Sequence, residues 1–224
     1  MKKTFIFILG SLILLSFVPV RAQIQGIDPG MFITWRSHNY VPPGFAGRPL
    51  PVPGSVVTAS FELIRGGRAN DVSGEEIFWY LDSDLLQSGR GLKKATFQIP
   101  EGAGGFMDLR VEVPNSSDGY LVKTVEVPVA TPEVVLDGPF PGGRFSGSEI
   151  KIGSLVYFLN SIPAGLSYSW NVNGSSPKNV EDPDRLVIRF PGDMKPGFKA
   201  EVYLMLSGRN GERVTGGRTF IYSP

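Results

Sequence analysis

The sequence contains no cysteine and only one histidine, His38, among its 224 residues. Without cysteine there is no disulfide, no thiolate nucleophile and no sulfur ligand for a metal. A hydrolytic triad uses a histidine as its base, and a typical zinc site draws on several histidine or cysteine side chains. A single histidine in a predicted loop therefore indicates neither chemistry, and we expect His38 to be a solvated loop residue.

An excess of charge of one sign is also missing. The chain has 22 basic and 21 acidic side chains, and without Lys2, Lys3 and Arg21 of the N-terminal segment, 19 basic side chains face 21 acidic ones. The formal charge of the remaining chain is then −2, which gives no electrostatic attraction to nucleic acid or to anionic lipid. We expect no nucleic-acid partner.

A long apolar run occurs only near the N-terminus. Residues 5–18 are almost entirely apolar, they follow two lysines, and residues 20–22 (VRA) place slim or small side chains at the −3 and −1 positions before Gln23. This pattern is typical of a secretory signal peptide, residues 1–22, cleaved before Gln23. The alternative is an uncleaved membrane anchor, for which the run is short, because a helical span needs about 20 apolar residues. We expect a mature chain without an integral membrane segment that is secreted, periplasmic or at the cell surface.

Two tryptophan-centred blocks lie 91 residues apart. Residues 76–82 (EIFWYLD) match 167–173 (SYSWNVN), residues 97–102 (FQIPEG) match 188–193 (IRFPGD), and residues 109–113 (LRVEV) match 200–204 (AEVYL). Residues 54–57 (GSVV) also resemble 153–156 (GSLV), which predicts about eight additional residues in the first copy between this strand and its tryptophan. Three blocks at one offset indicate that a single domain design occurs twice.

The segments between these blocks predict short antiparallel strands. Leu109, Val111 and Val113 alternate with polar residues, which is the period of a half-buried strand. Residues 115–119 (NSSDG) and 210–211 (NG) predict hairpin turns, and the 28 glycines and 19 prolines suit many turns. About seven strands per hundred residues predict an all-β chain of two immunoglobulin-like antiparallel β-sandwiches, residues 23–130 and 131–224, joined by a short linker.

The tryptophan strand carries a resemblance to a known family. The aromatic-x-Trp pattern and the following Asp- or Asn-containing turn, residues 78–84 and 168–174, resemble the third strand of bacterial immunoglobulin-like and PKD-like domains. The resemblance covers most of residues 30–224, although neither copy has the aspartate and two glycines that usually follow the tryptophan in PKD domains. It implies two tandem domains of a kind that usually serves as a non-catalytic spacer, an adhesin segment or an envelope-assembly subunit.

Trp79 and Trp170 have two interpretations. Either side chain could stack on a sugar ring, but both lie in the middle of a predicted strand, where a tryptophan packs between two sheets. We expect both to be core residues.

Acidic side chains gather near two turns. Asp82 and Asp84 flank the first, and Glu181, Asp182 and Asp184 precede a later strand. Calcium prefers six to eight oxygen ligands, but neither group has the dense spacing of a dedicated calcium loop, so we expect solvated turn residues and no metal or cofactor. A glycosidase needs two carboxylates facing each other across a cleft, and no pair is marked out by the sequence. We therefore expect no enzymatic activity.

The best candidate for a binding surface is an aromatic loop in the first domain. Trp35, Tyr40 and Phe45 lie within eleven residues, beside Pro42 and Pro43. Aromatic side chains on a proline-stiffened loop can bind a glycan or a protein at little ordering cost. Alternatively, they cover the open end of the sandwich or pack against the second domain. Sheet edges offer a further, weaker possibility, since an edge strand can accept a strand from another subunit unless prolines prevent it.

These observations predict a non-enzymatic interaction or structural protein of the cell envelope or extracellular space. It would present or space a binding surface, in adhesion or in the assembly of a surface structure, with an envelope or extracellular protein as partner. The alternative is a carbohydrate-binding module that holds a polysaccharide through Trp35, Tyr40 and Phe45.

Overall fold

The computed structural model describes residues 30–178, 180–208 and 211–224. The predicted signal peptide, its cleavage point and Asn210 of the last predicted turn lie outside these ranges. Among the described residues the helical content is one three-residue 3-10 turn, Pro163–Gly165. No helix in the described ranges has the length and apolarity that a membrane crossing requires.

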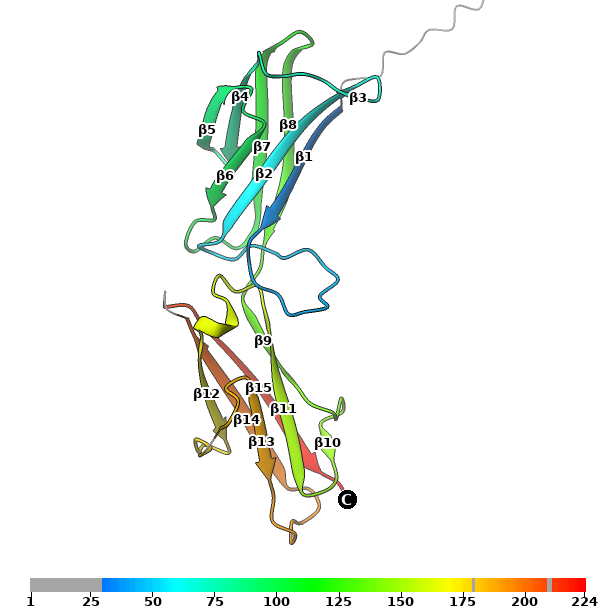
Figure 1. The fold of residues 1–224 in the computed structure, drawn as a ribbon, viewed down its shortest axis with the longest axis vertical. Helices are drawn as coiled ribbons and strands as arrows, with labels where there is room; N and C mark the ends of the chain where they lie inside the picture. The colour runs from blue at the N-terminus through cyan, green and yellow to red at the C-terminus, as the bar shows by residue number, and fades with distance from the viewer. Residues whose placement is uncertain (1–29, 179, 209–210) are drawn as a thin grey trace, which may run out of the picture.

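The first sandwich is built from two antiparallel sheets (Figure 1). One sheet has β2 at its centre, with β1 on one side and β6 and the short β3 on the other; the second sheet has the order β5–β4–β7–β8. The strands are β1 (Gly30–Ser37), β2 (Val56–Arg65), β3 (Arg68–Ala69), β4 (Glu76–Leu81), β5 (Asp84–Arg90), β6 (Lys94–Gln98), β7 (Gly105–Ser116) and β8 (Gly119–Val129).

The second sandwich repeats this plan with two differences. Its sheets have the orders β9–β11–β13 and β10–β15–β14–β12. The tryptophan strand β12 is an edge strand of its sheet, whereas β4 in the first sandwich has β5 beyond it. In addition, β10 pairs in parallel with β15. The strands are β9 (Glu133–Asp137), β10 (Arg144–Phe145), β11 (Glu149–Tyr157), β12 (Ser167–Val172), β13 (Arg185–Arg189), β14 (Lys199–Ser207) and β15 (Arg213–Tyr222). The predicted all-β fold of two immunoglobulin-like sandwiches is confirmed.

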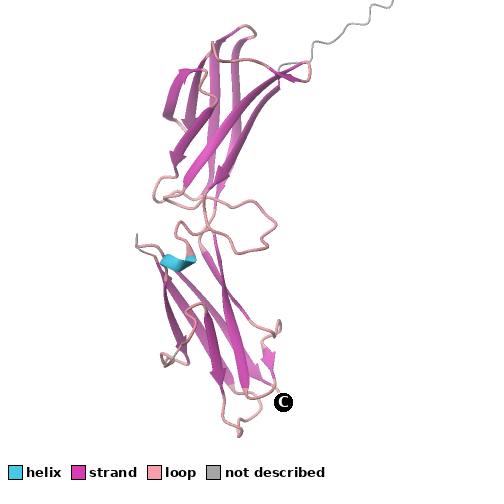
Figure 2. Ribbon diagram, viewed as in Figure 1, coloured by secondary structure: helices cyan, strands magenta, loops and turns pink. Residues whose placement is uncertain are grey.

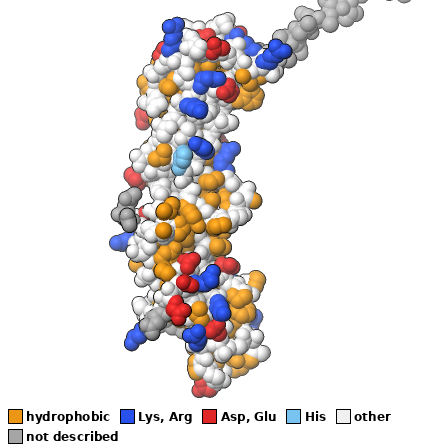
Figure 3. All heavy atoms as spheres, viewed as in Figure 1, with side chains coloured by type: hydrophobic (Ala, Val, Ile, Leu, Met, Phe, Trp, Pro, Cys, Tyr) orange, Lys and Arg blue, Asp and Glu red, His pale blue; other side chains and the backbone are white. Residues whose placement is uncertain are grey.

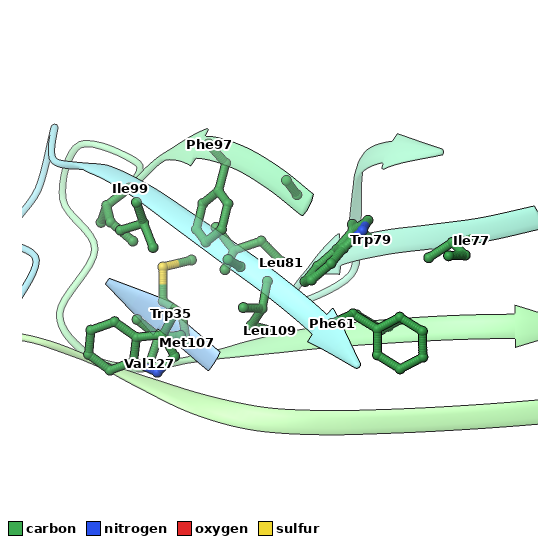
Figure 4. Packing of buried hydrophobic residues seen from close by; sticks show 14 of the residues in the cluster. Trp35, Phe61, Ile77, Trp79, Leu81, Phe97, Ile99, Met107, Leu109 and Val127 are labelled. Carbon is green, nitrogen blue, oxygen red and sulfur yellow. The ribbon is translucent and has the colours of Figure 1, made fainter. Parts of the chain in front are cut away.

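Each sandwich has its own core between its two sheets. In β7 every second side chain, from Met107 to Val113, is buried, as the period of two predicts. Figure 4 shows Phe61 of β2 and Leu109 of β7 lying in the core between the sheets of the first sandwich. A separate core around Trp170 and Phe220 fills the second sandwich.

The strand registers show a different offset between the two copies from the one that the sequence match predicts for β7 and β14. Trp79 lies opposite Val111 and Trp170 opposite Leu204, so the strands that follow correspond at an offset of 93 residues rather than 91. The slip of two keeps every side chain on its predicted face, because side chains alternate with a period of two. The sequence match was therefore right about the face and wrong about the register.

The second strands are matched differently from the prediction. Val57 lies opposite Phe97 and Ile150 opposite Ile188, so Val57 corresponds to Ile150 and not to Val156. The first copy is then two residues longer before its tryptophan rather than about eight. The resemblance between GSVV and GSLV is misleading, because GSVV spans the turn and the first residues of β2, whereas GSLV lies inside β11.

Both tryptophans are structural, as predicted. Trp79 is fully buried and its Nε1 donates to the Leu92 carbonyl oxygen at 2.9 Å. Trp170 is 4% exposed and its Nε1 donates to the Pro183 carbonyl oxygen at 2.8 Å. Leu92 and Pro183 both lie thirteen residues beyond their tryptophan, so the same hydrogen bond ties the tryptophan strand to the later segment in each sandwich.

A second shared contact joins the turn after each tryptophan strand to the neighbouring strand, β7 or β14. Asp82 and Asn173 have positive φ angles of 54° and 49°, a region that Asp and Asn tolerate better than most residues. The Asp108 amide donates to Asp82 Oδ1 at 2.8 Å, and the Glu201 amide donates to Asn173 Oδ1 at 2.8 Å. The Asp82 carboxylate, one of the candidate calcium ligands, therefore ties the β4–β5 turn to β7.

Candidate functional site

The loop between β1 and β2 leaves the first sandwich and lies along the top of the second, as the large loop between the two domains in Figure 2 shows. Its prolines at 42, 43, 49, 51 and 53 lack amide donors and favour an irregular path over strand pairing. Pro51 nevertheless takes part in the junction, because its carbonyl oxygen accepts from the Ala130 amide of the linker at 2.8 Å.

Trp35 belongs to the first core and not to the loop. It lies on β1, is 9% exposed, and in Figure 4 stands beside Met107 and Val127. The Arg48 guanidinium lies 4.5 Å from the centre of its ring and covers it from the loop side. A sugar ring cannot stack on a face that is already occupied in this way.

Tyr40 and Phe45 pack against the second sandwich. The Tyr40 amide donates to the Leu159 carbonyl oxygen at 2.8 Å, and its ring packs against the second core. The Phe45 ring makes edge contacts with Tyr157 and Phe158, with centroids 5.9 and 5.7 Å apart. The three predicted residues therefore do not form one exposed platform, and the alternative of packing against the second domain describes Tyr40 and Phe45.

The polar centre of the junction is Asn160 of the second sandwich. Its Nδ2 donates to the Pro53 carbonyl oxygen at 3.0 Å. Its Oδ1 accepts from Ser55 Oγ at 2.9 Å and from Asn39 Nδ2 at 3.0 Å. Its main-chain amide donates to Glu212 Oε1 at 2.9 Å. One side chain thus joins three positions of the first sandwich, and Ser55 and Asn39 are themselves buried.

The residues around Asn160 are held in a specific geometry. Asn39 Nδ2 also donates to the Phe158 carbonyl oxygen at 3.2 Å, while Ser37 Oγ donates to Asn39 Oδ1. Phe158 has a φ of 60°, which is strained for a bulky residue and costs on the order of 1–3 kcal/mol. Strain of this kind persists where the surrounding contacts fix the backbone, so the junction is a defined interface.

Sequence reasoning missed this network. Asn39 and Ser55 flank the proline-rich passage, where polar residues are ordinary turn formers, and Asn160 stands in a region with no motif. The three meet where Tyr40 pairs with Leu159 and Phe45 packs on Phe158, contacts between positions more than a hundred residues apart.

The remaining candidates lie on the surface. His38 is exposed, with Nε2 3.1 Å from Thr58 Oγ1. Asp84, Glu181, Asp182 and Asp184 are exposed, and the described ranges hold no group of three or more His, Cys, Asp or Glu side chains placed to share a metal ion.

Three groups have shifted pKa values, each from a local cause. Hydrogen bonds from the amide and hydroxyl of Ser73 lower the pKa of the Asp71 carboxyl. A hydrogen bond to Glu112 raises the pKa of Tyr120, and burial, followed by the charge of Asp184, raises the pKa of Tyr168. None of these arrangements pairs an acid with a base across a cleft, so the shifts reflect packing and surface hydrogen bonds.

No protein-family model matches the chain, and no curated protein matches it. Among solved structures, it is similar to the three N-terminal domains of the outer capsid protein Hoc of bacteriophage RB49, at 12% identity and a TM-score of 0.44 over 87% of this chain. It is also similar to SGBP-B of the Bacteroides ovatus mixed-linkage glucan utilization locus, solved with a heptasaccharide (12% identity, TM-score 0.26, 84% of this chain), and to murine CEACAM1b (13%, 0.26, 86%).

The chain spans 59% of the Hoc structure, 47% of SGBP-B and 99% of CEACAM1b. Identities and TM-scores this low carry no information on function, and the fold assignment rests on the strand pairing described above.

Proposed function

We propose that the protein is a non-enzymatic interaction or structural protein. It holds two immunoglobulin-like sandwiches in a fixed relative orientation and presents their faces to a partner outside the cytoplasm. The observation that supports this role best is the junction around Asn160, where hydrogen bonds and aromatic contacts join the two sandwiches.

The connection between the sandwiches leaves little freedom. β8 ends at Val129 and β9 begins at Glu133, so three residues join them, and the Ala130 amide is bound to Pro51. Domains on flexible linkers must lose orientational freedom when both engage one partner, whereas a fixed pair avoids this cost. A spacer or a two-domain binding surface benefits from this geometry.

Several side chains that the sequence offers as candidate site residues have structural contacts instead. Trp79, Trp170 and Asp82 serve the cores and hairpins, and His38 bonds a threonine on an exposed sheet face. A sugar-binding role for the Trp35, Tyr40 and Phe45 loop is less well supported, because these side chains are occupied at the core and the junction.

The proposal is tested by mild cross-linking of the tagged, exported protein in its native envelope fraction, followed by purification and mass spectrometry. We expect stoichiometric recovery of one or a few envelope proteins or of a cell-wall polymer. Recovery of the bait alone would overturn the proposal.

A variant pair links the result to the junction. Asn160→Ala removes the central hydrogen bonds, and Asn70→Ala, whose side chain donates to the neighbouring Asp71 carbonyl, is the matched control. If the fixed arrangement matters, Asn160→Ala reduces recovery of the partner and Asn70→Ala does not.

A further inference from the structure

The outer face of the β1–β2–β6 sheet has an unusual composition, and we call it the hydroxyl face. The strand registers arrange its central side chains in two rows across the three strands. The rows are Thr34, Ser60 and Lys94, and Arg36, Thr58 and Thr96. The visible side of the first sandwich in Figure 3 includes this face, with blue basic side chains and the pale-blue imidazole of His38.

The centre of this face is hollowed. Thr34, Arg36, Thr58, Ser60 and Lys94, together with Trp35, line an open hollow of about 330 Å³. Thr58 and Ser60 of β2 form its floor. Its two cationic residues lie on the flanking strands, Arg36 on β1 at one end of the second row and Lys94 on β6 at the opposite end of the first row. Because neighbouring strands lie about 4.8 Å apart, β1 and β6 are about 10 Å apart across β2.

Both cations lack a carboxylate partner in the described part of the chain. The ion pairs there join Arg65 to Asp118, Lys93 to Glu62, Arg110 to Glu112, and Glu149 to both Lys151 and Arg189. Glu62, the acidic residue on the same strand as the hollow, is engaged by Lys93 at 2.8 Å. Arg36 and Lys94 are therefore free to bind an external anion.

The hydroxyl groups have spare capacity as well. Thr58 Oγ1 lies 3.1 Å from His38 Nε2 and 3.5 Å from Thr96 Oγ1, while the Thr34 and Ser60 hydroxyls make no side-chain hydrogen bond within the described ranges. A hydroxyl can both donate to an oxyanion and accept from a sugar hydroxyl. Arginine adds a planar fork that matches a carboxylate or a sulfate.

We propose that the hydroxyl face binds an acidic polysaccharide, with a carboxylate or sulfate group of the polymer between Arg36 and Lys94 and sugar hydroxyls on Thr34, Thr58 and Ser60. A protein partner is disfavoured, because protein interfaces have an apolar, aromatic-rich centre and the exposed apolar side chains here, Phe32 and Val56, lie beyond the two rows. The proposal rests on the proposed interaction role and names the partner class of one face.

The test measures binding of the purified exported chain to polygalacturonate by calorimetry, with neutral dextran as the uncharged polymer. The double variant Arg36→Gln and Lys94→Gln removes both cations from exposed positions, so folding is preserved and the thermal unfolding midpoint checks this. The matched control, Lys199→Gln and Arg213→Gln, removes the same charge from exposed positions of the second sandwich. We expect the double variant to weaken binding by about tenfold or more and the control to leave it unchanged.

Each other outcome is decisive. Equal losses in both double variants would show nonspecific charge attraction, and unchanged binding in the Arg36 and Lys94 variant would show that the polymer binds elsewhere; both would overturn the assignment. Tighter binding of poly-glutamate would replace the polysaccharide with an acidic protein, and equal binding of polyphosphate would show a general oxyanion site. If polygalacturonate and dextran sulfate both fail to bind while the envelope pull-down recovers a protein, this inference falls and the proposed function stands.

Discussion

The two sandwiches share an internal frame and differ at the edge of the tryptophan sheet. In the first, β4 turns at residues 82–83 and pairs with β5. In the second, β12 makes a two-residue turn at 173–174, and Val172 and Ser175 exchange both main-chain hydrogen bonds. The described residues between this turn and β13, which are 176–178 and 180–184, form no further strand. The number of residues from the end of this turn to the next strand of the opposite sheet is the same in both sandwiches. Asp84 precedes Lys94, the first residue of β6, by ten residues, and Ser175 precedes Arg185, the first residue of β13, by ten. Leu86 and Pro177 stand at the same distance beyond the turn, and proline removes the amide donor that a continuing strand needs.

The outer faces of the β1–β2–β6 sheet and the β9–β11–β13 sheet differ in charge pairing. On the second sandwich Glu149 lies 3.5 Å from Lys151 and 3.1 Å from Arg189, so these two cations share an acidic partner within the sheet. On the first, Arg36 and Lys94 border hydroxyl groups without an acidic partner among the described residues. The comparison shows that buried contacts preserve the frame, while exposed positions on the same frame are free to take different roles.

The largest expected effect comes from breaking what the two sandwiches share. Trp79→Ala and Trp170→Ala each remove a large buried ring and its carbonyl hydrogen bond, and each should lower the free energy of unfolding by about 3–5 kcal/mol. Chemical denaturation monitored by circular dichroism measures this loss. Phe106→Ala, at an exposed aromatic of β7, is the control and should change stability little. A loss below about 1 kcal/mol at either tryptophan would contradict its core role.

The junction is expected to show the next largest effect. Asn160→Ala removes one hydrogen bond from the Pro53 carbonyl and one from each of the buried Asn39 and Ser55 side chains, which should cost about 1–3 kcal/mol. Scanning calorimetry should show the two domains unfolding at more separated temperatures than in the wild-type protein. An unchanged profile, equal to that of Asn70→Ala, would mean that the domains unfold independently.

Much of this frame can be predicted from the sequence, and the reason is the alternation of side chains. The tryptophan strands and the buried positions of β7 and β14 follow from period-two patterns, which survive a register error of two residues. The junction is not predictable in this way, because Asn160 meets Asn39 and Ser55 only through folding of residues more than a hundred positions apart. Sequence proximity groups Trp35 with Tyr40 and Phe45, although Trp35 lies in a strand and its side chain faces the core.

A smaller effect is expected at the shared turn. Asp82→Ala and Asn173→Ala each remove the acceptor of a main-chain amide and place alanine at a positive φ, so each should cost about 1–2 kcal/mol. Asp82→Asn is the matched variant, since asparagine fills this role in the second sandwich. It should stay within about 0.5 kcal/mol of wild type in urea denaturation. An alanine variant as stable as the asparagine variant would show that the side-chain acceptor is dispensable.

The smallest expected effect concerns the edge at which the sandwiches differ. The Val172 amide and carbonyl point away from β14 toward Ser175. Main-chain groups of successive residues point to opposite sides of a strand, so the amides and carbonyls of Tyr168 and Trp170 point to the same outer edge of β12 as those of Val172. Pro177→Leu restores a donor at the position that Leu86 occupies in β5, so the hairpin should extend and slow amide hydrogen exchange at Trp170 while changing stability by a few tenths of a kcal/mol. Pro191→Leu, in an exposed turn after β13, controls for the loss of a proline. Unchanged exchange at Trp170 would mean that the path of residues 176–184, rather than Pro177 alone, keeps this edge open.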